Sequence, residues 1–186
     1  LDPPPDIETV NDAARKLQDA ERRIIDEFFW FWPSKWGQGR NDPAFQALLD
    51  GDKQRAFDIW AAMERDKDAN LRIVARHNLA VIYHFYALTY EMKVLERNRR
   101  DATLDRTAAY WKASFQRWEA LADDDRLWSQ MKDRVEQIND PRLTTGFVRR
   151  IRSSLPQALD KVNAELAICF AEKEQYEHAA THITYM

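Results

Sequence analysis

Four histidines are the residues in this sequence best suited to chemistry, and they occur as two pairs. His178 and His182 are four residues apart, which would place both imidazoles on one face of a helix, as a pair of metal ligands requires. Glu174 lies one turn earlier and would add a carboxylate, so a helical metal protein or metal-dependent enzyme is one hypothesis. The residue after His178 is not the Glu of a zinc protease. Ordinary helix-surface histidines are the competing interpretation, and the one we prefer.

The other pair, His77 and His84, is seven residues apart and is typical of a core edge or a groove. The sequence contains no Gly-rich phosphate loop, no Gly-x-Ser-x-Gly elbow and no Asp-rich calcium loop. We therefore predict no catalytic residue, no cofactor and no metal, and a protein that is not an enzyme. The single cysteine, Cys169, excludes an internal disulfide, fits a reducing cytoplasm and, among apolar neighbours, predicts a buried thiol.

Composition narrows the class of partner. The chain has 186 residues, 45% of them hydrophobic and only four of them glycine, which favours a helical fold with a substantial core. The net charge is −3 and the charges are interspersed, so we predict no nucleic-acid and no membrane partner. Arginine clusters at 22–23, 97–100 and 149–152 keep nucleic-acid binding as a minor alternative.

The sequence begins without Met and ends inside a helical pattern, so we expect a fragment of a longer protein.

Apolar periodicity and breaker residues predict an all-α protein. A first helix begins after Asp6, and a second, highly apolar helix runs over 19–32 and ends at Pro33. The stretch 33–43 has two glycines and predicts a loop that exposes Trp36. Further helices are predicted near 43–49, 53–65, 71–98, 104–122, 125–138, 144–153, 156–172 and 175–186.

An internal repeat lies within these helices. The segment 56–66 aligns with 114–124 at an offset of 58, pairing Phe57 with Phe115 and Trp60 with Trp118. With Leu79, Ala80 and Tyr83, and then Leu166, Ala167 and Phe170, these residues resemble the tetratricopeptide repeat. The resemblance implies stacked antiparallel helical hairpins over about 41–66, 71–124 and 156–186, with the helical segment 1–40 packing on or linking to them. Glu174 stands where the turn Gly of the last repeat is expected.

A second resemblance concerns the segment 17–33, which is similar to bacterial proteins in which a J-domain-like amino-terminal region precedes such repeats. The His-Pro-Asp tripeptide of J domains is absent from the sequence. The resemblance therefore implies a chaperone-associated protein, with a DnaK-type heat-shock chaperone as one possible partner, and assigns no co-chaperone activity to these residues.

Tetratricopeptide domains that clasp acidic tails use Lys and Asn on the first helices of successive repeats. Asn78 and Lys161 match that pattern, whereas Glu165 replaces an expected Arg and Asn41 and Phe45 replace an expected Lys and Asn. We therefore predict a protein-interaction module that binds a helix or peptide in a groove between the helices near 71–98 and 156–172. The predicted partner-binding residues are Arg76, Asn78, Tyr83, Lys161, Asn163 and the exposed Trp36.

Overall fold

The computed structural model describes residues 6–97, 104–144 and 146–186, and all of their regular secondary structure is helical. The predicted all-α class is thereby confirmed. Arg99 and Arg100 of the second arginine cluster lie outside the described residues. The elements are α1 (Ile7–Gln18), α2 (Ala20–Phe28), the 3₁₀ helix η1 (Gly39–Asn41), α3 (Pro43–Leu49), α4 (Lys53–Met63), α5 (Ala69–Arg97), α6 (Leu104–Ala122), α7 (Asp125–Ile138), α8 (Phe147–Glu172) and α9 (Tyr176–Ile183).

Aspartates fix where most of the shorter helices begin. Asp42 accepts hydrogen bonds from the backbone N–H groups of Ala44 and Phe45, and Pro43 occupies the first helical position of α3. The same capping pattern occurs at the starts of α1, α2, α4 and α7. A capping carboxylate satisfies N–H groups that have no partner within the helix, and its charge is favourable at the positive end of the helix dipole.

Two predicted helix boundaries are wrong. The predicted helix 19–32 ends as α2 at Phe28, because His77 and Asn78 of α5 bind the backbone groups that the next helical turn would use. The predicted helices 144–153 and 156–172 form one continuous helix, α8, with Pro156 inside it. Proline removes one helical hydrogen bond. The hydroxyls of Ser153 and Ser154 donate to carbonyls one turn earlier, just before this interruption.

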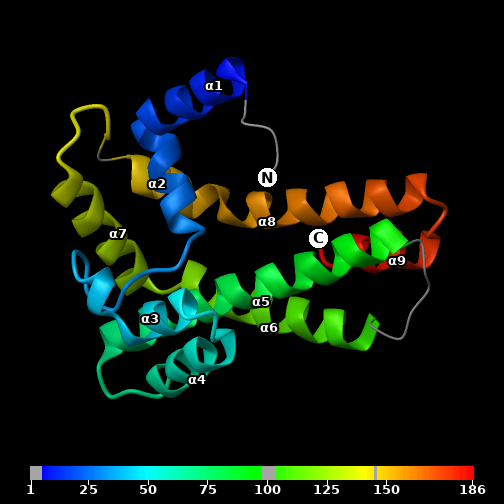
Figure 1. Cartoon of the computed structure of the whole chain (residues 1–186), viewed down its shortest axis with the longest axis horizontal. Helices are drawn as coiled ribbons and strands as arrows, with labels where there is room; N and C mark the ends of the chain where they lie inside the picture. The colour runs from blue at the N-terminus through cyan, green and yellow to red at the C-terminus, as the bar shows by residue number, and fades with distance from the viewer. Residues whose placement is uncertain (1–5, 98–103, 145) are drawn as a thin grey trace.

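The most extensive contacts between helices join consecutive pairs. α3 packs on α4, α5 on α6, and α8 on α9, while α4 also packs against α5. Each pair corresponds to one of the segments that resemble a repeat. α5 and α8 are the two long helices, and they run side by side in the same direction (Figure 1). α7 packs across one end of them, where it contacts α5, α6 and α8.

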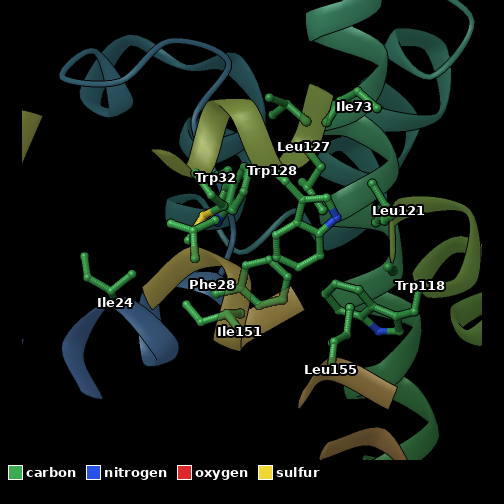
Figure 2. Close-up of a cluster of buried hydrophobic side chains, with 14 of the residues drawn as sticks. Ile24, Phe28, Trp32, Ile73, Trp118, Leu121, Leu127, Trp128, Ile151 and Leu155 are labelled. Carbon is green, nitrogen blue, oxygen red and sulfur yellow. The ribbon is translucent and has the colours of Figure 1, made fainter. Parts of the chain in front are cut away.

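The largest core cluster lies where α2, α5, α6, α7 and α8 meet. Phe28 stacks on Trp128 with ring centroids 5.6 Å apart and lies 5.8 Å from the ring of Trp118, so three segments distant in sequence share one aromatic centre (Figure 2). Ile24, Trp32 and the partly buried Trp36 add further side chains of the amino-terminal segment to this cluster. Residues of the segment 1–40 are therefore part of the main core.

Two smaller clusters extend the core along α5. One holds Trp60 of α4 between the alanines of α3 and Leu79 of α5, and the other surrounds Trp111 of α6 and Phe170 of α8. The predicted buried thiol is wrong, because Cys169 is exposed on α8, although its neighbour Phe170 is buried. Within the described residues, none of the helices combines the length and the apolar character that crossing a bilayer requires.

Candidate functional site

An apolar groove of about 470 Å³ lies between α5 and α8. The α5 wall is formed by residues between Val81 and Leu88, and the α8 wall by Ala158, Leu159 and Val162. Phe29, Trp30 and Phe31 close one end. Small-molecule and peptide sites are commonly concave, largely apolar hollows of this kind, so this groove is the main candidate for a functional site.

Helical periodicity explains why the walls are apolar. Val81, Phe85 and Leu88 are spaced i, i+4 and i+7 on α5, so they form one stripe about 11 Å long. On α8, Ala158 and Val162 begin a stripe with the same spacing. The two helices run in the same direction (Figure 1), and residues of both stripes line the groove. Met92 on α5 and Cys169 on α8 continue the stripes beyond the hollow, and both are exposed.

The rim of the groove exposes large apolar side chains. Trp30 is 67% exposed and Phe85 is 53% exposed, although both are among the most apolar residue types. Lys53 is the one cation among the lining residues. Contiguous exposed aromatic surface around a hollow is uncommon on monomeric proteins and marks interaction sites.

Trp118 lines the groove and carries one unpaired polar group. The indole nitrogen of Trp118 is buried and has no acceptor within the described residues, although Trp118 itself lines the groove. Because that nitrogen is buried, the surface that Trp118 offers to an occupant of the groove is the apolar part of its ring.

His84 also lines the groove, where its ring packs edge-on against Trp111 at 4.9 Å. Burial lowers the pKa of His84 from 6.5 to about 4, because the apolar surroundings disfavour the imidazolium. The side chain is therefore neutral at physiological pH.

The lowered pKa of His84 predicts a pH-dependent stability. The unfolded chain takes up a proton near pH 6.5 and the folded chain only near pH 4, so the stability is fully present above pH 6.5 and is lost as pH falls towards 4. We expect His84→Leu to reduce the loss of unfolding free energy between pH 7.5 and 4.5 by roughly 1–3 kcal/mol. Urea unfolding of parent and variant at both pH values measures this difference, and equal losses would contradict it.

None of the six predicted partner-binding residues lines the groove. Asn78 is fully buried: its side-chain oxygen accepts from the N–H of Trp32 at 2.7 Å, and its amide nitrogen donates to the carbonyl of Trp32 at 2.8 Å. Its neighbour His77 donates through Nε2 to the carbonyl of Phe28 at 2.7 Å. The prediction that Asn78 meets a partner is corrected, because its amide is occupied in fixing the backbone after α2.

Asn163 is also fully buried, with its oxygen 3.0 Å from Nδ1 of His182, so its prediction as a groove residue is corrected too. Lys161 is exposed and lies 3.8 Å from Glu165 one turn later on α8. The Lys and Asn side chains predicted for a carboxylate clamp therefore occupy different environments, one at the surface and one in the core.

Arg76 and Tyr83 take part in a polar network between α4, α5 and α6. Glu64 binds Arg76 at 3.5 Å and Arg117 at 2.9 Å, and the Arg117 guanidinium lies 5.0 Å from the ring centre of Tyr83. Trp36, predicted to be exposed, is half-buried under the guanidinium of Arg134 at 4.7 Å. The exposed tryptophan of this region is Trp30 instead.

The predicted surface position of the histidine pair is also corrected. His178 and His182 are buried and both stack on the ring of Phe170, whereas Glu174 is exposed in a left-handed turn at φ 60°. Among the described residues, no three His, Cys, Asp or Glu side chains are placed to hold a metal ion.

Two arginines of the third cluster, Arg150 and Arg152, are engaged with acids and aromatic rings. Arg150 forms an ion pair with Glu21, and Arg152 binds Asp125 at 2.6 Å while lying over the ring of Trp128. These contacts connect α8 to α2 and α7, so Arg150 and Arg152 have a structural role.

The sequence did contain a signal for the groove. The spacing of Val81, Phe85, Leu88 and Met92 marks an apolar stripe on α5. Because the long helix is apolar on several faces, this stripe could not be distinguished from the faces that form the core.

Comparisons of the chain with protein families, with characterised proteins and with solved structures find no match. The likeness to tetratricopeptide and J-domain-associated proteins stays a prediction.

Proposed function

We propose that this protein is a non-enzymatic interaction module that binds an amphipathic helix of a protein partner in the groove between α5 and α8. The observation that supports it most directly is the open apolar hollow with Trp30 and Phe85 exposed at its rim. A helix is the fitting occupant because two parallel helices already form the walls, and a third helix would pack its apolar side chains between them.

The size and chemistry of the groove define the partner further. A stripe of about 11 Å accommodates apolar side chains at positions i, i+3 or i+4, and i+7 of the bound helix. Lys53 at the rim favours an acidic residue beside it.

The proposal includes a DnaK-type chaperone, which the sequence resemblance suggests, as one candidate source of the bound amphipathic helix. It also includes a cytoplasmic location for the protein. Recognition by a two-residue carboxylate clamp is not part of the proposal, because Asn78 is buried and fully engaged.

Cys169 provides a reporter for the test. It is exposed, it is the only cysteine in the sequence, and it continues the α8 stripe beyond the groove. An environment-sensitive fluorophore on Cys169 should respond when peptides selected from a displayed library of amphipathic helices are titrated onto the protein. We expect the double variant Trp30→Ala, Phe85→Ala to weaken binding at least about tenfold, because exposed aromatic anchors dominate such interfaces.

The matched control is Tyr176→Ala, Ile183→Ala, which removes two exposed apolar side chains from α9, away from the groove. The control should bind like the parent. An acidic peptide with a free carboxylate, offered in parallel, represents the chaperone-tail interpretation. Equal binding by the parent and the groove variant would place the interaction on another surface.

A further inference from the structure

Helix α1 is poorly covered by the rest of the chain. None of its described side chains is buried, and none belongs to a core cluster. Figure 1 shows α1 at the outer edge of the molecule, joined to the other helices through α2. Ile7 is 80% exposed and Val10 is 50% exposed, so α1 presents large apolar side chains to water.

The apolar residues of α1 lie on one side of the helix. Ile7, Val10 and Ala14 are spaced i, i+3 and i+7, and all three are exposed. The sequence continues this spacing with Leu17. Apart from Ala13, the other residues of α1 are polar or charged. α1 is therefore an amphipathic helix whose apolar face is exposed at its described positions.

The groove between α5 and α8 matches this helix in spacing and in length. Its α5 stripe, from Val81 through Phe85 and Leu88 to Met92, repeats at i, i+4, i+7 and i+11 and is about 16–17 Å long. α1 has 12 residues and is about 18 Å long. The apolar face of α1 can therefore lie along the whole stripe, with its side chains between those of α5 and α8.

The charges of α1 also suit the groove. Lys53 is the one cation among the lining residues, and no Asp or Glu of the described chain lines the groove. The first turn of α1 carries the exposed carboxylates of Asp6 and Glu8. A hydrogen bond from the backbone N–H of Thr9 lowers the pKa of Asp6, so this group is charged at neutral pH. An acidic helix start meets a cation at the rim and no opposing carboxylate.

The connection between α1 and α2 keeps α1 from lying along the groove of its own chain. The groove begins at Phe29, directly after α2, and α2 is about 13 Å long. If α1 turned back along α2, only about one of its turns would extend past Phe29. The observed junction is held by Arg142, which donates to the carbonyl of Gln18 at 2.6 Å, and by Asp19, which caps α2. A second copy of the chain can offer the whole of α1.

We propose that the groove between α5 and α8 of one copy binds the apolar face of α1 from a second copy. This inference rests on the proposed function, because it names the amphipathic helix that the groove accepts. Reciprocal exchange of α1 fills both grooves of a pair, and exchange of an identical element is a low-cost route to dimers.

Sedimentation velocity over a wide range of protein concentration tests the proposal. We expect the parent to pass from monomer to dimer as concentration rises. The α1 variant, Ile7→Gln, Val10→Gln, removes the apolar stripe and keeps a good helix former at both positions. It should weaken self-association at least about tenfold, as should the groove variant, which lacks the rings of Trp30 and Phe85. The α9 control variant should associate like the parent.

Mixing the two variants identifies the contact. The α1 variant keeps an intact groove and the groove variant keeps an intact α1, so together they form one α1–groove contact that neither forms alone. With an environment-sensitive fluorophore on Cys169 of the α1 variant, unlabelled groove variant should produce a saturable signal. Unlabelled α1 variant should produce none.

Three results would overturn the inference: a parent that stays monomeric, a dimer that persists in the α1 variant, and a mixture of the two variants without a signal. Titration of the labelled parent with displayed amphipathic helices then separates this inference from the proposed function. Binding of such helices that is lost in the groove variant leaves the proposed function standing, whereas absence of binding removes both.

Discussion

Replacing Asn78 with Asp is expected to lower the free energy of unfolding by about 3–5 kcal/mol at neutral pH. One side-chain oxygen would still accept from the N–H of Trp32. The other would replace the amide nitrogen that now donates to the carbonyl of Trp32 at 2.8 Å, so two acceptors would face each other in the core. For a chain of this length the melting temperature should fall by roughly 6–20 °C.

The pH dependence of this loss distinguishes the mechanism from a general packing defect. Protonation would restore a donor to the introduced carboxyl, so its pKa in the folded state should lie above its unfolded value near 4. The folded state then binds the proton more tightly, and the loss relative to the parent shrinks as pH falls and grows as pH rises. Asn11→Asp, an exposed substitution in α1 with the same change of charge, is the control and should have little effect.

Trp60→Ala and Trp118→Ala should each cost about 3–5 kcal/mol of unfolding free energy, because each removes a large side chain that is 1% exposed. Trp60 stacks on Phe31 at 4.8 Å, and Trp118 lies within 6 Å of the rings of Phe28, Phe29 and His77. Chemical denaturation followed by circular dichroism measures the loss.

Trp30→Ala is the matched control, since that side chain is 67% exposed; its expected loss is below about 0.5 kcal/mol. Parent-like stability of both buried-site variants would mean that the aligned positions do not occupy equivalent core sites. A large loss in the control would mean that Trp30 supports the fold, and its use as a binding anchor would need a different variant.

The helical class and several boundaries followed from local chemistry. The predicted ranges 43–49, 104–122 and 125–138 coincide with α3, α6 and α7, where Asp42 and Asp124 cap helix starts and Asn139, at φ 51°, ends α7 in a left-handed conformation. These signals depend on neighbours in the sequence, so they can be read without knowledge of the tertiary structure.

The end of α2 depended on distant residues instead. Phe28 and Trp32 would pair within a helix, but His77 and Asn78, more than forty positions later, bind their backbone groups. No periodicity within 19–32 encodes that competition. Pro156 was misleading for a similar reason: its local preference breaks helices, while packing on both sides of it keeps α8 continuous.

The candidate site was predicted at the level of the two helices and not of the side chains. Buried positions on α5 include the consecutive residues His77, Asn78, Leu79 and Ala80, so the helix has no single apolar face from which the exposed side could be deduced. The repeat pattern predicted that the side chain of Asn78 faces outward. Hydrogen bonds to another segment instead hold this side chain in the core. The groove stripe became visible once α8 was known to lie beside α5.

Helix α5 contributes to all three core clusters: Ile73 and Val74 to the largest, Leu79 and Ile82 to that of Trp60, and Ala87 and Leu95 to that of Trp111. Inserting or deleting one residue near its middle would rotate every later side chain by about 100° and shift it by about 1.5 Å. Such a change would misdirect the second half of the helix even if every other residue were kept. The register of α5 therefore constrains how sequences with this fold can diverge. Insertions and deletions are expected in the connections between helices, whereas α5 can vary by substitution alone.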